Sequence, residues 1–103
     1  MVDRSNHTTI RFSGSVTFSQ VEDAYDRLRD ALFGQASVAV DCDQLAETDL
    51  GFVQTLIAAR VSARRRDVAF SLKQPLAEPL LDVLRRGGFL NDPQHADFWT
   101  GGV

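Results

Sequence analysis

The side chains best suited to nucleophilic or metal chemistry are Cys42, His7 and His95. Cys42 stands between Asp41 and Asp43, and nearby negative charge raises the pKa of a thiol, which disfavours the reactive thiolate. The two histidines lie near opposite ends of the chain, outside the short spacings typical of zinc ligands. We therefore expect no catalytic residue, no metal and no other cofactor, and the sequence favours a protein that is not an enzyme.

A second chemical possibility uses charged residues at strand ends. Asp41 is expected to end one strand, Lys73 to end the next, and Asp49 to open the helix between them. Ligands of open α/β sheets bind beyond the carboxyl ends of the strands, so this arrangement is similar to a response-regulator receiver with a phosphoaspartate switch. A receiver also needs an acidic pair for Mg²⁺ after its first strand, where this chain has Arg11 and Ser13. The preferred alternative is an acidic, solvated loop in which Asp49 caps the following helix.

The elements that must position these residues begin with a predicted hairpin. Thr9–Phe12 alternates polar and apolar residues, Ser13–Gly14 suits a tight turn, and Ser15–Val16 can resume as the partner strand. Thr17 and Gln20 then have the spacing of a capping box, in which a hydroxyl and an amide satisfy free backbone N–H groups. The pattern predicts an amphipathic helix that begins near residue 19.

The rest of the chain alternates between strands and helices. Ser37–Val40 reads as a buried central strand that ends at Asp41, and Cys42–Asp49 is predicted to be a loop. A second helix, a strand over Val68–Leu72 and a third helix closed by Gly87–Gly88 follow. This order predicts an α/β domain with a partly parallel sheet.

Length, composition and charge limit the function classes. One hundred and three residues with 44% apolar content predict one domain over residues 1–103, with an uncertain tail at 91–103 in which Phe98 and Trp99 could pack back onto the body. A formal net charge of −3 gives no electrostatic reason to bind nucleic acid. No apolar stretch is long enough to insert into a membrane, and the first residues do not resemble a secretory signal, so a cytoplasmic protein is expected.

One pattern combines five parts of the chain: Val38–Asp41, a short loop that ends in Asp49, a helix rich in small and apolar residues, the strand over Val68–Leu72, and Leu84–Phe89 with its Gly-Gly-Phe ending. Together they resemble the STAS domain, the family of the bacterial anti-sigma factor antagonists. The resemblance covers residues 8–90. It implies a small mixed sheet of four or five strands with helices packed mainly on one face, and a function of docking on a partner without catalysis.

The STAS signature differs at the residue that partner kinases phosphorylate. Asp49 matches the signature aspartate, Leu50 the first serine, Gly51 the phosphorylated serine and Phe52 the glycine. Gly51 has no hydroxyl group, so the resemblance predicts no phosphoacceptor at the usual site. Asp-Leu-Gly-Phe-Val-Gln54 is similar to a variant signature of bacterial signalling and chemotaxis proteins. Thr48 is a conceivable substitute acceptor, although capping is its default role.

The resemblance implies a partner-binding surface at the start of the second helix. Its residues are Glu47, Thr48, Asp49, Leu50, Gly51, Phe52 and Gln54. The expected partner is an anti-sigma factor or a sensor kinase, bound in the unphosphorylated state. Alternatives are a constitutive subunit of a lipid-transporter or chemotaxis assembly, and the receiver-like switch. Phe52 could instead belong to the core and Leu50 could staple the helix to the sheet. Self-association through the edge of the N-terminal hairpin is a further possibility.

Overall fold

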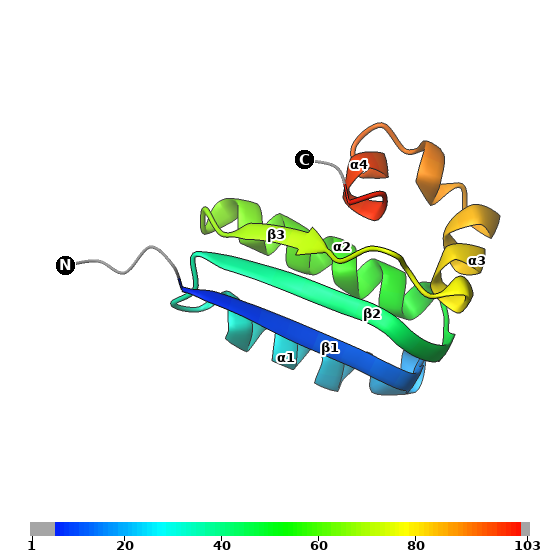
Figure 1. Cartoon of the computed structure of the whole chain (residues 1–103), viewed down its shortest axis with the longest axis horizontal. Helices are drawn as coiled ribbons and strands as arrows, with labels where there is room; N and C mark the ends of the chain where they lie inside the picture. The colour runs from blue at the N-terminus through cyan, green and yellow to red at the C-terminus, as the bar shows by residue number, and fades with distance from the viewer. Residues whose placement is uncertain (1–5, 102–103) are drawn as a thin grey trace.

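A computed structural model describes residues 6–101 and shows three strands, four α-helices and two short 3₁₀ helices within that range (Figure 1). In chain order the elements are β1 (His7–Val16), η1 (Phe18–Gln20), α1 (Val21–Leu32), β2 (Ser37–Thr48), α2 (Leu50–Arg65), β3 (Ala69–Leu72), α3 (Glu78–Arg86), η2 (Phe89–Asn91) and α4 (Ala96–Trp99). No helix in this described range is both long and apolar enough to cross a membrane.

The sheet has the order β1-β2-β3, and both strand pairs are parallel. The α/β class and the STAS-like arrangement are confirmed, with three strands in residues 6–101 where four or five were expected. The predicted N-terminal hairpin is wrong, because β1 runs without reversal from His7 to Val16. Gly14 adopts a φ of +69° within the strand and does not form a hairpin turn.

The predicted loop over Cys42–Asp49 is also wrong, because β2 continues to Thr48. Its second half pairs with the second half of β1, where Ser13 lies opposite Gln44 and Val16 opposite Thr48. Two register shifts interrupt this part of the ladder. Such irregularities displace side chains from strict alternation, so the acidic segment lacks a visible strand period.

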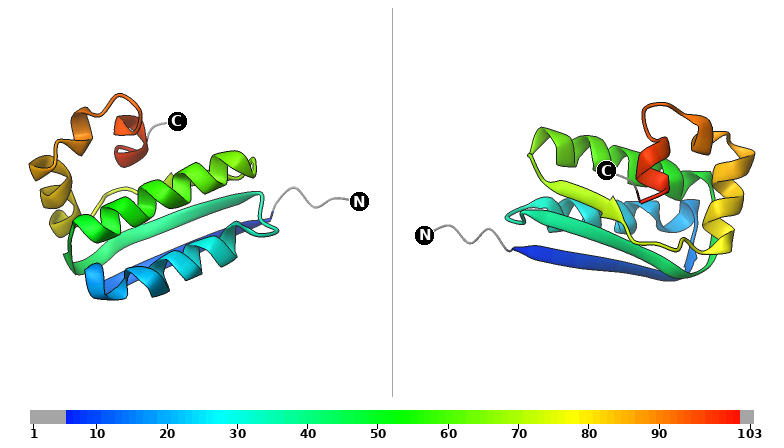
Figure 2. Two further views of the ribbon diagram at one scale, coloured as in Figure 1. Left: turned by 180° about the vertical axis from the view of Figure 1, so that it is seen from behind. Right: turned by 45° about the horizontal axis from the view of Figure 1, so that its top comes forward.

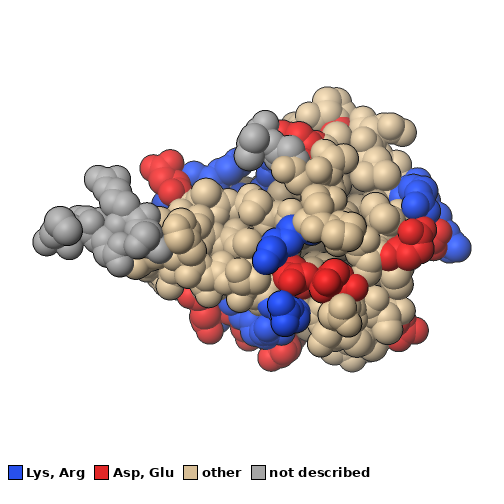
Figure 3. Space-filling view, viewed as in Figure 1, with Lys and Arg blue, Asp and Glu red and all other residues tan. Residues whose placement is uncertain are grey.

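Helices α1 and α2 lie side by side on one face of the sheet, and the opposite face is open (Figures 1 and 2). Ile10 and Phe12 of β1, together with Val38 and Val40 of β2, are buried between sheet and helices. The prediction that the helices pack mainly on one face is therefore confirmed. Figure 3 shows the open face, where basic and acidic side chains lie next to one another over the sheet.

The C-terminal segment packs back onto the body, as expected. Phe98 and Trp99 of α4 are buried, and the Phe98 ring stacks on Phe70 of β3 with centroids 5.6 Å apart. Arg60 of α2 lies over the other side of this cluster, 4.9 Å from the centre of the Phe98 ring, and pairs with Asp97 at 3.5 Å. Residues 92–101 thereby cover the β3 side of the domain.

Candidate functional site

Asp49 connects the start of α2 to the segment that precedes α1. Its Oδ1 accepts a hydrogen bond from the Gly51 N–H at 3.0 Å, which confirms the predicted N-cap. Its Oδ2 accepts a second bond, at 2.9 Å, from the N–H of Phe18 in η1. Both carboxylate oxygens are therefore occupied by backbone groups of two separate elements. Asp49 therefore positions this region.

Glu47 and Thr48, the last residues of β2, are joined to β1. The Ser15 hydroxyl donates to Glu47 Oε1 at 2.7 Å, and the Thr48 hydroxyl donates to the Val16 carbonyl at 2.9 Å. Glu47 remains exposed, whereas Thr48 is half-buried. The Thr48 oxygen thus has a structural partner, and Glu47 is the accessible carboxylate at this end of the sheet.

Of the two bulky apolar residues of the expected surface, Leu50 is exposed and Phe52 is buried. Leu50 is 49% exposed, and Gln54, one turn further along α2, is also exposed. Phe52 is fully buried, with its ring edge-to-face against Phe12 and the centroids 5.1 Å apart. The expectation that Phe52 contacts a partner is corrected, because its side chain belongs to the core.

Gly51 faces neighbouring backbone and side chains. A Cβ atom built on it would lie 3.1 Å from Asp49 Oδ1, 3.3 Å from the Cα of Phe18 and 3.3 Å from Cγ1 of Val21. These distances are shorter than ordinary van der Waals contact, so any side chain here would have to displace η1 or α1 slightly. At the position where the family signature has serine, this chain therefore has no hydroxyl group and little space for a side chain.

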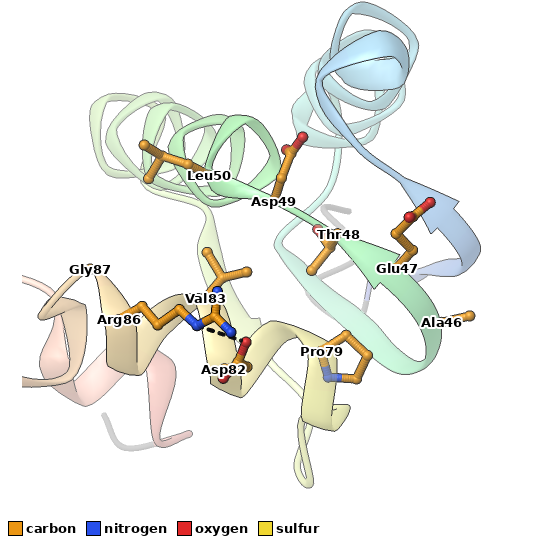
Figure 4. Close-up of a pocket in the computed structure, with 10 residues that line it drawn as sticks. All are labelled: Ala46, Glu47, Thr48, Asp49, Leu50, Pro79, Asp82, Val83, Arg86 and Gly87. Atoms are coloured by element: carbon orange, nitrogen blue, oxygen red, sulfur yellow. Dashed lines mark ion pairs between the residues drawn. The ribbon is translucent and has the colours of Figure 1, made fainter.

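Two hollows lie on either side of the Asp49–Gly51 segment. The first, of about 520 Å³, separates the end of β2 and the start of α2 from α3 (Figure 4). Its lining residues are Ala46, Glu47, Thr48, Asp49, Leu50, Pro79, Asp82, Val83, Arg86 and Gly87. Asp82 and Arg86 form an ion pair on its α3 side at 3.2 Å. The second hollow, of about 450 Å³, lies between α1 and α2 and includes Phe18 and Gly51.

Phe18 is the surface residue that the sequence interpretation missed. Its side chain is 75% exposed, the largest exposure of any bulky apolar residue in the described part of the chain. The sequence does carry a signal for this exposure: Phe18 lies inside the Thr17–Gln20 capping box and outside the apolar stripe of the following helix. A large aromatic residue off that stripe points away from the core.

Asp41 lies on the open face of the sheet inside β2. Its Oδ1 accepts from the Asp43 N–H at 3.1 Å, and its Oδ2 pairs with Arg11 across the strands at 3.3 Å. The Asp43 N–H and the Arg11 guanidinium hold the pKa of Asp41 below its ordinary value, against the opposing effect of burial. The prediction that a strand ends at Asp41 is wrong, so this carboxylate is not beyond a strand end as in a receiver.

Cys42 and the histidines have structural surroundings. Burial raises the pKa of the fully enclosed Cys42 thiol to about 12, and the charges of Asp41 and Asp43 act in the same direction. His7 contacts the Ser37 hydroxyl, and the buried His95 ring contacts Arg60 at 2.9 Å. No group of three or more His, Cys, Asp or Glu side chains within residues 6–101 could hold a metal ion.

Comparisons with known proteins agree with this fold. The Mglu crystal structure matches with a TM-score of 0.60 at 17% identity, over 73% of this chain and 19% of the Mglu chain. The STAS domain of a SulP transporter from Vibrio cholerae matches with a TM-score of 0.59 at 13% identity, over 84% of this chain and 67% of that domain. At these identities the likeness concerns the fold.

Sequence comparison gives the family. No curated protein matches the chain. A family model described as "Mlab, STAS domain" matches residues 1–91, most of the sequence. STAS domains act as interaction modules, which fits a site made of an exposed leucine, a carboxylate and an amide around a capped helix start. The chain belongs to the STAS family.

Proposed function

We propose that this chain is a constitutive protein-docking module without enzymatic activity, whose partner is bound at the start of α2 with no phosphorylation switch. The observation that carries the proposal is Gly51. It stands at the serine position of the family signature and offers no hydroxyl group, and a Cβ atom built on it would lie 3.1–3.3 Å from atoms of Asp49, Phe18 and Val21. A module that cannot be phosphorylated here keeps one charge state and one set of contacts on its docking face.

The contact residues are Glu47, Leu50 and Gln54, which we term the docking surface. Leu50 supplies a half-exposed apolar group, and Glu47 and Gln54 supply exposed polar groups beside it. An apolar anchor surrounded by polar groups is typical of the centre of a protein interface. Thr48, Asp49 and Gly51 support this surface through their contacts with β1 and η1, and Asp49 also caps α2.

The first candidate partner is an anti-sigma factor or a sensor kinase of a bacterial cytoplasm. The test is affinity capture from a lysate of the source cells with the wild-type chain, Leu50→Glu and Val61→Glu, followed by identification of the captured proteins. Val61 is the matched control, because it is an exposed apolar residue of the same helix, 40% exposed, outside the docking surface. The proposal requires capture of a regulatory protein by the wild type and Val61→Glu but not by Leu50→Glu. Equal capture by the wild type and both variants would contradict it.

The second candidate is a constitutive subunit of a lipid-transporter or chemotaxis assembly. Gly51 favours it, because a permanent subunit needs no switch, and the match to the family model described as "Mlab, STAS domain" agrees with it. The identity of the captured protein distinguishes the candidates. Incubation of Gly51→Ser with the partner and ATP, followed by intact-mass measurement, gives a second criterion: modification of this variant alone indicates a kinase partner.

A further inference from the structure

The second hollow is a groove between α1 and α2, which we term the α1–α2 groove. Its lining residues are Phe18, Val21, Glu22, Tyr25, Asp26, Gly51, Gln54, Thr55 and Ala58. We propose that this groove binds an amphipathic helical segment of the partner, with an apolar side chain against Phe18 and basic side chains against Glu22 and Asp26. The inference rests on the proposed function, because it extends the docking surface across Gln54 to the other side of α2.

Phe18 is held in place by its backbone while its ring is exposed. The Phe18 N–H is bound to Asp49 at 2.9 Å, and the flanking turn is closed by the Thr17 N–H, which donates to the Gln20 side chain at 2.8 Å. A ring on a fixed backbone loses little conformational entropy when a partner covers it. Aromatic residues of this kind contribute a large share of binding energy at interfaces.

The walls of the groove suit one helix. Val21 and Tyr25 stand one turn apart on α1 and are half-buried. On α2 the wall is made of small residues, Gly51, Thr55 and Ala58, and the Thr55 hydroxyl donates to the Gly51 carbonyl at 2.8 Å. Gly51 to Ala58 spans about 10 Å of helix, which equals about two turns of a bound helix. These small residues allow the backbone of a bound helix to approach α2 closely. The Thr55 hydroxyl already has a hydrogen-bond partner within α2, so it needs none from the ligand.

The acidic rim of the groove favours a ligand with positive charge. Glu22 and Asp26 lie one turn apart on the α1 rim, about 6 Å along the helix axis, and no Lys or Arg lines the groove. Glu22 forms no ion pair within residues 6–101, and Asp26 shares Arg29 with Asp30 at 3.3 and 3.6 Å. The α2 rim is uncharged, with Gln54 and Ala58. A helix with Lys or Arg on the flank facing α1 complements this asymmetry.

The test uses a displayed library of helical peptides of about 18 residues, long enough to form a stable helix. One face is apolar and the flanking positions are randomised among Lys, Glu and Gln. We expect selection on the wild-type chain to enrich peptides with Lys on one flank only. Binding of an enriched peptide is then measured by titration calorimetry against groove variants and matched controls.

Phe18→Ala and the pair Glu22→Lys with Asp26→Lys should each weaken this peptide at least about tenfold. Two control substitutions should leave the affinity within about twofold, because neither residue lines the groove. They are Glu78→Lys, an exposed acid in the first turn of α3, and Phe33→Ala, another exposed aromatic residue. Urea unfolding of each variant verifies that it is folded.

The results separate this inference from the proposed function. If no peptide is enriched, if enriched peptides lack a Lys flank, or if Phe18→Ala binds as the wild type does, the groove assignment is overturned. If Leu50→Glu abolishes peptide binding while Phe18→Ala preserves it, the groove is wrong and the docking surface stands. Equal capture of the partner by the Leu50→Glu and Val61→Glu chains would instead overturn the proposed function itself.

Discussion

Replacing Asp49 with alanine removes the two hydrogen bonds that connect α2 to η1. Loss of an N-cap destabilises a protein by about 1 kcal/mol. The second bond, from the Phe18 N–H to a charged oxygen, contributes about 1.5 kcal/mol. Asp49→Ala should therefore lower the free energy of unfolding by about 2–3 kcal/mol. In urea this corresponds to a midpoint about 1–2 M lower, given the usual dependence of stability on denaturant.

The Asp49→Asn variant separates the two bonds. Asparagine caps helices about as well as aspartate, but its side chain has a single acceptor oxygen for two N–H groups, so about half of the loss should remain. Asp23→Asn, an exposed acid in the first turn of α1, is the control and should change stability by less than about 0.5 kcal/mol. If Asp49→Asn unfolds at the same urea concentration as the wild type, the bond to Phe18 contributes nothing and the positioning role is refuted.

Three further predictions concern the core and the open face. Phe52→Ala should lower the free energy of unfolding, measured in urea, by about 3–5 kcal/mol, while Leu50→Ala should change it by under about 0.5 kcal/mol. Similar losses for the two variants would contradict the assignment of Phe52 to the core and Leu50 to the surface. Cys42 should resist a thiol reagent at pH 8 until the chain unfolds, because it is buried and its pKa is raised to about 12; rapid labelling of the folded protein would contradict this. The lowered pKa of Asp41 stabilises the fold above the unfolded-state pKa and loses this effect as the pH falls through the folded-state value. Asp41→Asn should therefore flatten the loss of stability on acidification. An unchanged acid profile would argue against the hydrogen bonds that the Asp43 N–H and Arg11 donate to this carboxylate.

The helices and the central strand follow from the sequence because their signals are local. Apolar spacing places α1, α2 and α3, and Asp49 is recognisable as an N-cap. The long β1–β2 pairing could not be read in this way. Ser13 to Val16 and the acidic second half of β2 are polar, and bulges disturb their alternation. These residues become strands because they pair with each other, which is a contact between segments about 30 residues apart.

The position of the candidate site stays a prediction from the family signature, whereas the exposure of its side chains comes from the structure. The family signature placed it at Asp49–Gly51, yet which side chains reach the surface depends on how α2 packs on the sheet. Phe52 shares a helical stripe with the buried Leu56 and Ala59, a pattern that indicates the core, and Leu50 lies off this stripe. The exposure of Phe18 has a local signal in the Thr17–Gln20 capping box, but its backbone contact with Asp49 joins distant segments and could not be predicted in this way.

Hydrogen–deuterium exchange on the chain with and without its captured partner tests the central claim most directly. The N–H group of the half-exposed Leu50 lies in the first turn of α2, where it has no partner within the helix, so it should exchange quickly in the free chain. Partner binding should slow exchange over residues 47–54 and leave residues 61–66 at the far end of α2 unchanged. Protection confined to β1 or to the far end of α2, with residues 47–54 exchanging as before, would contradict docking at the start of α2.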